Sequence, residues 1–465
     1  MKLQNSLSKR LEDFEPREGK TVSLYTCGPT VYDHAHIGNL RTYIFEDTLR
    51  RSLRLQGYQV DHVMNITDID DKTIVRSQAK YPKDQPAAAL AKLAQHYLTI
   101  FLTDSSALGI NLDDSRIEPA TEHIDDIKSA IAKIPNKYVA DDGVYFDLSH
   151  CDDYGVLTQL DRSHQHHRIN NDDYDKEHVA DFALWKLKQG NEPAWEFKLD
   201  DKQITGRPGW HIECSAIIAS SFKSTPIDIH TGGVDLKFPH HENEIAQHQA
   251  AYKRSLARFF VHAEHLLVDG KKMSKRLKNF YTLADIQKWG FSPLAFRLLV
   301  LQAHYRKQLN FTKQSLAAAQ SFLQDLYGLS DRQFQSLPVA ADSELMQLLA
   351  KLSQQIRDQL AHDLDTPDAL TALSRLSDYL SIRPLPQANL GHFKQFMALA
   401  EEAFGLGLSQ RLPLGEELAA LLTSRETARQ NNDFATADKL RVELVRQGIE
   451  LRDTDFGVVW QRTIP

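Results

Sequence analysis

Two histidines near the start of the chain, His34 and His36, could contact an anion. They precede Gly38 and Asn39, where a helical pattern begins. A helix start offers free N–H groups and a field that favours negative charge. Histidines there could donate hydrogen bonds to phosphate oxygens, and Gly38 would let a ligand lie close to the backbone. Taken alone, this pattern is also common on protein surfaces.

A second candidate is the strongly basic run at residues 271–278. Five of its eight residues are lysine or arginine, and none is acidic. One interpretation is a solvated charged surface. The other is a loop that brings ammonium groups to a triphosphate, where they would stabilise charge developing on the transferred phosphate oxygens.

A third candidate is a metal site. If Pro239 begins a helix, His240 and Glu244 lie one turn apart on the same face. Cys27 and Cys214 could complete a four-coordinate zinc site with them. The two cysteines are 187 positions apart. Spacing therefore does not decide between this site and the alternative, which is two buried thiols and a surface His–Glu pair.

The elements that must position these residues indicate a parallel α/β sheet. We expect a strand at 21–27, a helix at 37–55 and a second strand at 60–66. Sites in such sheets lie at the carboxyl ends of the strands. Cys27 and the segment 65–68 both fall at such ends.

The α/β domain is expected to span 1–312, with an insertion at about 115–200. A helical domain is expected at 313–411, because apolar residues recur at helical spacing over 345–360. A small final unit at 412–465 shows two helical segments and a hairpin pattern.

Composition narrows the class of protein. Apolar residues make up 42% and charged residues 25% of the chain, as in ordinary globular proteins, and no window is apolar enough to cross a membrane. Only three cysteines occur, which excludes a disulfide framework and fits a reducing cytoplasm. The net charge of −7 argues against nucleic-acid binding by bulk charge. Any RNA would have to be bound through local basic surface and shape.

Together, these motifs resemble the cysteinyl-tRNA synthetase family of class I aminoacyl-tRNA synthetases, and the likeness runs nearly end to end. The segments that carry it are Thr26–Asp33 with His36–Asn39, which looks like the HIGH region; Asn65–Lys72; Gly209–Cys214; Phe238–Gln247; Lys272–Lys275, which looks like the KMSKS loop; and His304–Asn310.

The resemblance implies a Rossmann-like class I catalytic domain with an insertion, a helical bundle domain and a C-terminal α+β anticodon-binding unit. It implies ATP-dependent ligation of L-cysteine to tRNA(Cys) through a cysteinyl-adenylate, with Mg²⁺ accompanying ATP. It also implies a cytoplasmic monomer that binds no membrane.

The resemblance further implies one zinc ion per chain, held by Cys27, Cys214, His240 and Glu244, with His241 as the second choice for the histidine ligand. Cysteine and serine differ by one atom, and an apolar pocket separates such substrates by only ~1–3 kcal/mol. Zinc binds thiolate strongly. A direct contact between zinc and sulfur would therefore select cysteine without an editing site.

Other roles also come from the resemblance. Catalysis is assigned to His36, Lys272 and Lys275; ATP binding to His34, His36, Asn39 and Lys275; cysteine binding to Gly28, Thr67 and Trp210; and anticodon reading to Arg429, Asp438 and Asp453. Residues 421–465 hold seven basic and seven acidic side chains, so recognition there should rest on hydrogen bonds and stacking to unpaired bases. Trp460 could stack on a base, but it is also typical of hairpin core.

Two motifs depart from the family pattern. Asn39 stands at the last position of the HIGH motif, where it donates hydrogen bonds without carrying charge. Arg276 and Lys278 stand where the KMSKS region has Ser and Gly, which adds positive charge and could change the flexibility of the loop. These departures bear on the efficiency of activation and not on its nature.

Three alternatives are less well supported by the sequence. A ligase that passes activated cysteine to a small amine resembles the catalytic half but lacks a final unit such as 412–465. A non-catalytic RNA- or metal-binding paralogue is expected to lose Lys275, His36 or the zinc set, and this chain has all of them. A zinc hydrolase would need a His-Glu-x-x-His helix motif, which the sequence lacks.

Overall fold

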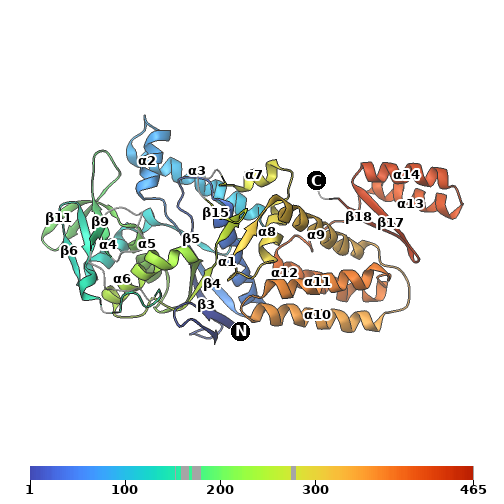
Figure 1. Ribbon diagram of the computed structural model, residues 1–465, viewed down its shortest axis with the longest axis horizontal. Coiled ribbons are helices and arrows are strands. Elements are labelled where there is room, and N and C mark those ends of the chain that lie inside the picture. The colour runs from blue at the N-terminus through green and yellow to red at the C-terminus, as the bar shows by residue number, and fades with distance from the viewer. Residues whose placement is uncertain (152, 159–166, 170–179, 274–278, 464–465) are drawn as a thin grey trace.

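The structure is a computed structural model that describes residues 1–151, 153–158, 167–169, 180–273 and 279–463. The predicted ATP-binding residue Lys275, together with Arg276 and Lys278, lies outside these ranges. Figure 1 shows an elongated molecule. Its central α/β part lies between an inserted sheet at one end and a helical region that carries a small final unit at the other.

A five-stranded parallel sheet forms the centre of the molecule. Its strands, in spatial order, are β13 (Ala257–Ala263), β12 (Ile227–Gly233), β3 (Thr21–Thr26), β4 (Gln59–Ile66) and β5 (Arg116–Pro119). All neighbouring pairs are parallel, so the carboxyl ends of the strands share one edge. Every residue of β12 is buried, as expected for a strand covered on both faces. The predicted strands at 21–27 and 60–66 are confirmed.

Helices surround this sheet. α1 (Ile37–Leu55) connects β3 to β4 and confirms the predicted helix at 37–55. The other helices of this part are α2 (Asp71–Lys80), α3 (Pro86–Ala107), α5 (Trp210–Ser221), α6 (Glu242–Tyr252), α7 (Leu283–Lys288) and α8 (Pro293–Leu301). Two small sheets complete it: the hairpin of β1 (Lys2–Asn5) and β2 (Arg10–Asp13), and the sheet of β15 (Lys271–Lys272), β14 (Leu266–Val268) and β16 (Leu309–Phe311).

Between β5 and α5 the chain forms a separate, mainly antiparallel sheet. The strands of this sheet are β6 (Lys137–Val139), β7 (Gly143–Phe146), β8 (His167–Ile169), β9 (Ala180–Leu187), β10 (Trp195–Leu199) and β11 (Lys202–Pro208). The same segment also forms the helix α4 (Ile124–Lys133). β5 lies at the start of the expected insertion, yet it pairs with β4 in the central sheet. Only Gly209 separates β11 from α5, so the inserted sheet helps to position that helix.

Four long helices follow the α/β part. They are α9 (Lys313–Asp331), α10 (Ser343–Ala361), α11 (Thr366–Ser381) and α12 (Leu390–Phe404). The apolar face predicted over 345–360 is buried on α10. The same apolar core includes residues of α1 and α8, so the helical region packs directly against the α/β part.

The final unit consists of α13 (Glu416–Gln430), α14 (Phe434–Arg446) and a hairpin of β17 (Ile449–Thr454) and β18 (Gly457–Arg462). The two predicted helices and the hairpin are confirmed. Trp460 is only 5% exposed and packs in the small core of this unit, so it is a hairpin core residue. Within the described ranges, no helix is both long enough and apolar enough to span a bilayer.

Candidate active site and metal centre

The four predicted zinc ligands meet near the carboxyl edge of the central sheet. Cys27 follows β3 and Cys214 lies on α5. His240 lies in the short helical turn Lys237–His241 that leads into α6, and Glu244 lies in the first turn of α6. Their ligand atoms all lie within 4.8 Å of one another, and all four residues are buried. Folding therefore brings together side chains from distant parts of the sequence, as a shared metal site requires.

The charges in this cluster favour a cation. Burial acts to raise the pKa of the Cys214 thiol, but the hydrogen bond from Cys27 and the charge on His240 outweigh burial and lower this pKa to about 6. Burial also acts to raise the pKa of Glu244, but His230 and His240 lower it well below its usual value. These negative groups hold the pKa of His240 at about 10, although burial acts to lower it.

The donor set suits a zinc ion. Glu244 Oε1 is buried and makes no hydrogen bond, although it lies 2.8 Å from His240 Nε2. His240 Nε2 also lies 3.5 Å from the Cys214 sulfur, and His240 Nδ1 lies 2.9 Å from His211 Nδ1. A partner at Nδ1 leaves Nε2 as the ligand atom, an arrangement common among metal-bound histidines. Sulfur, imidazole nitrogen and carboxylate oxygen are all ligands that zinc takes.

His241, the second choice for the histidine ligand, belongs to an overlapping group. Its Nε2 lies 3.4 Å from Cys27 Sγ. Together with His230 and Glu244, these two residues also have ligand atoms within 4.8 Å of one another. This second group lacks Cys214 and so offers one thiol instead of two. We therefore keep His240 as the preferred ligand.

His36 and Asn39 cap the start of α1. The backbone N–H of Asn39 donates to His36 Nδ1 at 3.1 Å, and the backbone N–H of His36 donates to Asn39 Oδ1 at 3.4 Å. This reciprocal arrangement is a capping box. It gives Asn39 a structural role that the ATP-binding prediction did not include, and it fixes the His36 ring at a helix end that favours anions.

The segment after the basic loop also contacts the start of α1. The backbone N–H of Ile37 donates to the carbonyl oxygen of Tyr281 at 2.9 Å. The His36 ring lies edge-to-face against Phe280, with ring centroids 4.6 Å apart. Residues that follow the basic run are therefore held beside the predicted phosphate-binding residues.

Met273, near the start of the basic run, reaches the same place. A Cβ added to Gly38 would lie 2.5 Å from Met273 Cε. Lys272, predicted as catalytic, is exposed on β15 and directly precedes Met273. The two described ends of the basic loop thus converge on the start of α1, which fits the predicted ATP contact of Lys275.

A cavity of about 360 Å³ joins the metal cluster to the start of α1. Its lining includes six predicted site residues, namely Cys27, Gly28, His34, His36, Asn39 and Trp210. The Trp210 ring stacks on His240, with centroids 4.3 Å apart. The cavity therefore has one end near the thiols and another at an anion-favouring helix start, where an amino acid and a nucleotide could meet.

Gly28 and Thr67, the two other residues predicted to bind cysteine, differ in their position relative to the cavity. Gly28 lines the cavity, and its backbone lies so close to β4 that a Cβ would be 1.8 Å from the carbonyl oxygen of Asn65. Thr67 is buried, and it is not among the described residues that line this cavity. Its hydroxyl donates to Glu213 Oε2 at 3.0 Å.

Two of the three predicted anticodon residues meet in the final unit. Arg429 Nη1 donates to Asp453 Oδ2 at 2.7 Å. Arg425, which sequence reasoning missed, donates to both carboxylate oxygens of Asp453 at 3.0 and 3.1 Å. Asp438 lies exposed on α14, one turn after the exposed ring of Phe434. The helical i, i+4 spacing of Arg425 to Arg429 and of Phe434 to Asp438 was the available signal.

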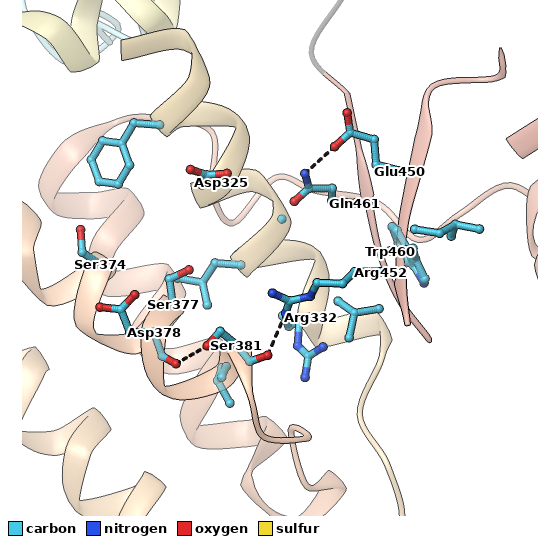
Figure 2. Close-up of a pocket in the computed structure, with 16 residues that line it drawn as sticks. Asp325, Arg332, Ser374, Ser377, Asp378, Ser381, Glu450, Arg452, Trp460 and Gln461 are labelled. Atoms are coloured by element: carbon cyan, nitrogen blue, oxygen red, sulfur yellow. Dashed lines mark hydrogen bonds between the residues drawn. The ribbon is translucent and has the colours of Figure 1, made fainter. Parts of the chain in front are cut away.

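A second cavity, of about 520 Å³, lies between the helical region and the final unit. Figure 2 shows α9 and α11 on one side and the β17–β18 hairpin on the other. Arg452 crosses between them and donates to the carbonyl oxygen of Ser381 at 2.9 Å. The described residues that line this cavity include none of the predicted site residues. We therefore assign the chemistry to the first cavity.

Known proteins similar to this chain agree with one another. Residues 13–321 match the family model described as tRNA synthetases class I (C) catalytic domain, and residues 413–460 match the cysteinyl-tRNA ligase anticodon binding domain. The cysteine–tRNA ligase of Solibacter usitatus is 40% identical, over 99% of this chain and 99% of the relative. The cysteine–tRNA ligase of Chlamydia pneumoniae is 40% identical, over 97% and 96%. The methionyl-tRNA synthetase of Mycobacterium tuberculosis, solved with methionyl-adenylate, shares the fold with a TM-score of 0.60 at 14% identity, over 84% of this chain and 93% of that one.

Proposed function

This chain belongs to the cysteine–tRNA ligase family of class I aminoacyl-tRNA synthetases, and from that premise we propose that it joins L-cysteine to tRNA(Cys) through a cysteinyl-adenylate. Charging of tRNA with cysteine is the activity of the family. The adenylate route, the zinc ion and the residue roles are the finer parts of the proposal. The observation that carries them is the buried Cys27, Cys214, His240 and Glu244 cluster beside a cavity that reaches α1.

In the first step, a carboxylate oxygen of cysteine attacks the α-phosphorus of ATP, and pyrophosphate leaves. His34 and His36 hold the phosphates at the start of α1, while Lys272 and Lys275 neutralise the charge that develops on them. The attacking carboxylate is already ionised at neutral pH, so this step needs no general base. Positioning and charge stabilisation supply most of the rate.

Selection of cysteine takes place at the other end of the cavity. Gly28 and Trp210 line the pocket there. A zinc ion held by the two thiols, His240 and Glu244 would supply a bond to the substrate sulfur, for which the oxygen of serine is a poor substitute. An apolar pocket alone would separate the two amino acids by only ~1–3 kcal/mol.

In the second step, a hydroxyl of the terminal ribose of tRNA attacks the carbonyl carbon of the adenylate, and AMP leaves. Arg429, Asp438 and Asp453 read the anticodon in the final unit. That unit lies at the opposite end of the molecule from the inserted sheet (Figure 1). This separation suits an extended RNA whose two ends are bound at different places. The match at 413–460 also favours tRNA over a small amine as the acceptor.

The test is ATP–pyrophosphate exchange by the purified protein, with cysteine and serine compared and the metal content measured. We expect exchange with cysteine, little with serine, and about one zinc ion per chain, as one four-ligand site holds. Metal-free protein that still prefers cysteine would contradict the zinc role. Exchange without transfer to tRNA would contradict the ligation step. The monomeric state, the cytoplasmic location and the use of Mg²⁺ stay predictions.

A further inference from the structure

A buried series of hydrogen bonds lies behind the cavity. The backbone N–H of Gly28 donates to Asn65 Oδ1 at 3.0 Å, and Asn65 Nδ2 donates to Thr67 Oγ1 at 3.3 Å. The Thr67 hydroxyl in turn donates to Glu213 Oε2 at 3.0 Å. Asn65 and Thr67 are 2% exposed and Glu213 is fully buried. The series therefore links the ends of β3 and β4 to the first turn of α5 through direct hydrogen bonds.

The ends of this series adjoin the two thiols of the metal cluster. Gly28 directly follows Cys27, and Glu213 directly precedes Cys214. The two thiols come from separate elements, a strand end and a helix. The series of hydrogen bonds is thus a direct side-chain connection between the backbone segments that carry them.

Backbone contacts hold the same loop in place. The backbone N–H of Thr67 donates to the carbonyl oxygen of Pro29 at 3.1 Å, and the N–H of Val31 donates to the carbonyl oxygen of Thr67 at 3.1 Å. Gly28 lies against Asn65 with no room for a Cβ. A shift of Thr67 would therefore move the wall of the cavity that Gly28 forms.

We propose that Glu213 is a positioning residue for cysteine recognition. Its carboxyl group holds Thr67 and, through Asn65, fixes the Gly28 segment beside the thiol-binding end of the cavity. This inference rests on the proposed function. Bonds between zinc and sulfur are about 2.3 Å long, so small errors in the spacing of the two cysteines weaken the site. A buried hydrogen bond enforces that spacing because leaving it unmade is costly.

This arrangement also defines the part played by Thr67. Its hydroxyl proton is directed to Glu213, and its oxygen accepts from Asn65. Thr67 therefore acts on the substrate through the Gly28 segment and not by donating its hydroxyl proton to cysteine.

Three variants test the proposal: Glu213→Ala, Glu213→Gln and Thr67→Val. The KM for cysteine and the KM for ATP are measured separately by pyrophosphate exchange, together with metal content. We expect Glu213→Ala to raise the KM for cysteine about tenfold, the effect of one lost buried hydrogen bond. Thr67→Val should raise it at least as much, because it also removes the acceptor of Asn65 Nδ2. The KM for ATP should hardly change. Glu213→Gln should stay near wild type, because its amide oxygen still accepts from Thr67.

The double variant Glu213→Ala/Thr67→Val should raise the KM for cysteine by less than the product of the two single effects, because both changes remove the hydrogen bond between Thr67 and Glu213. Asp331→Ala is the matched control. Asp331 is a fully buried carboxylate in the helical region, 2.8 Å from Arg411, and its loss should lower thermal stability without changing the KM for cysteine. If Glu213→Ala does not fold, Thr67→Val carries the test, since it exchanges one hydroxyl for a methyl group.

Equal increases in the KM for cysteine and for ATP would overturn the proposal, and so would a Glu213→Gln protein as impaired as Glu213→Ala. Failure of the proposed function gives a different result: wild-type protein would then show no cysteine-dependent exchange. Wild-type exchange with unchanged Glu213→Ala and Thr67→Val proteins would refute the positioning role alone.

Discussion

Met273 packs against Gly38 so closely that a Cβ at position 38 would lie 2.5 Å from Met273 Cε and 3.0 Å from two atoms of the His36 ring. Gly38 lies in the first turn of α1, and Met273 directly follows β15 within the basic run at 271–278. The helix start and Met273 are therefore in contact, and a side chain at position 38 would displace the Met273 methyl group and crowd the His36 ring.

From this packing we expect Gly38→Ala to slow cysteine-dependent pyrophosphate exchange by roughly 10- to 100-fold, because small displacements of positioning groups have effects of that size. The rate at saturating substrates measures it. Gly391→Ala is the control, since a Cβ there meets nothing within 4 Å and the rate should stay unchanged. A Gly38→Ala enzyme with the wild-type rate would show that the loop does not depend on this contact.

Replacement of Cys214 by serine is expected to remove the metal and to slow cysteine-dependent exchange by more than about 100-fold, since even partners of metal ligands cost 10–100-fold. Metal analysis and exchange assays measure the two effects. Cys151→Ser is the matched control, because Cys151 lies outside the cluster and its loss should change neither. If the Cys214→Ser protein keeps both its metal and its activity, Cys214 is not a metal ligand.

Asp71, at the start of α2, binds Lys186 at 2.9 Å and also binds Arg207, and so joins the central part to the inserted sheet. Burial acts to raise the pKa of Asp71, but Arg207 and Lys186 lower it to about 2. A carboxylate whose pKa is lowered by folding stabilises the fold above its unfolded pKa of about 3.9, and loses this effect as the pH falls towards 2.

The difference in Tm between wild type and Asp71→Asn should therefore be constant at neutral pH and narrow below about pH 4. Thermal unfolding across this pH range measures it. The difference should be modest, because the Asp71 side chain is 42% exposed and solvent screens its ion pairs. A difference that widens on acidification would contradict the assignment.

Phe434, 59% exposed at the start of α14, should contribute to RNA binding if Asp438 reads the anticodon. Stacking of one base on an aromatic ring is worth about 1–3 kcal/mol, so Phe434→Ala should raise the KM for tRNA roughly tenfold. Pyrophosphate exchange, which needs no tRNA, should stay unchanged. Val445→Ala, also at an exposed position of α14, is the control and should change neither the KM for tRNA nor the rate of pyrophosphate exchange. An unaltered KM for tRNA in Phe434→Ala would remove this residue from the binding surface.

Local patterns in the sequence were enough to predict the strands at 21–27 and 60–66, the helix at 37–55 and the apolar face over 345–360. The set of metal ligands came from the family resemblance. The buried β3 strand and the amphipathic α10 helix carry their periodicity in their own residues. The capping partnership of His36 and Asn39 and the hydrogen bond from Thr67 to Glu213 did not follow from such patterns. The first contact depends on the direction of the backbone at the helix start. The second depends on long-range packing, since it joins residues 146 positions apart.

The separation of Cys27 and Cys214 also bears on how the protein is made. The first thiol leaves the ribosome 187 residues before the second, and Glu244 follows later still. A complete coordination sphere cannot exist until more than half of the polypeptide has been synthesised. If the cluster binds zinc as proposed, the free energy of binding becomes available only then, and it would stabilise the packing of α5 and α6 against the central sheet late in synthesis.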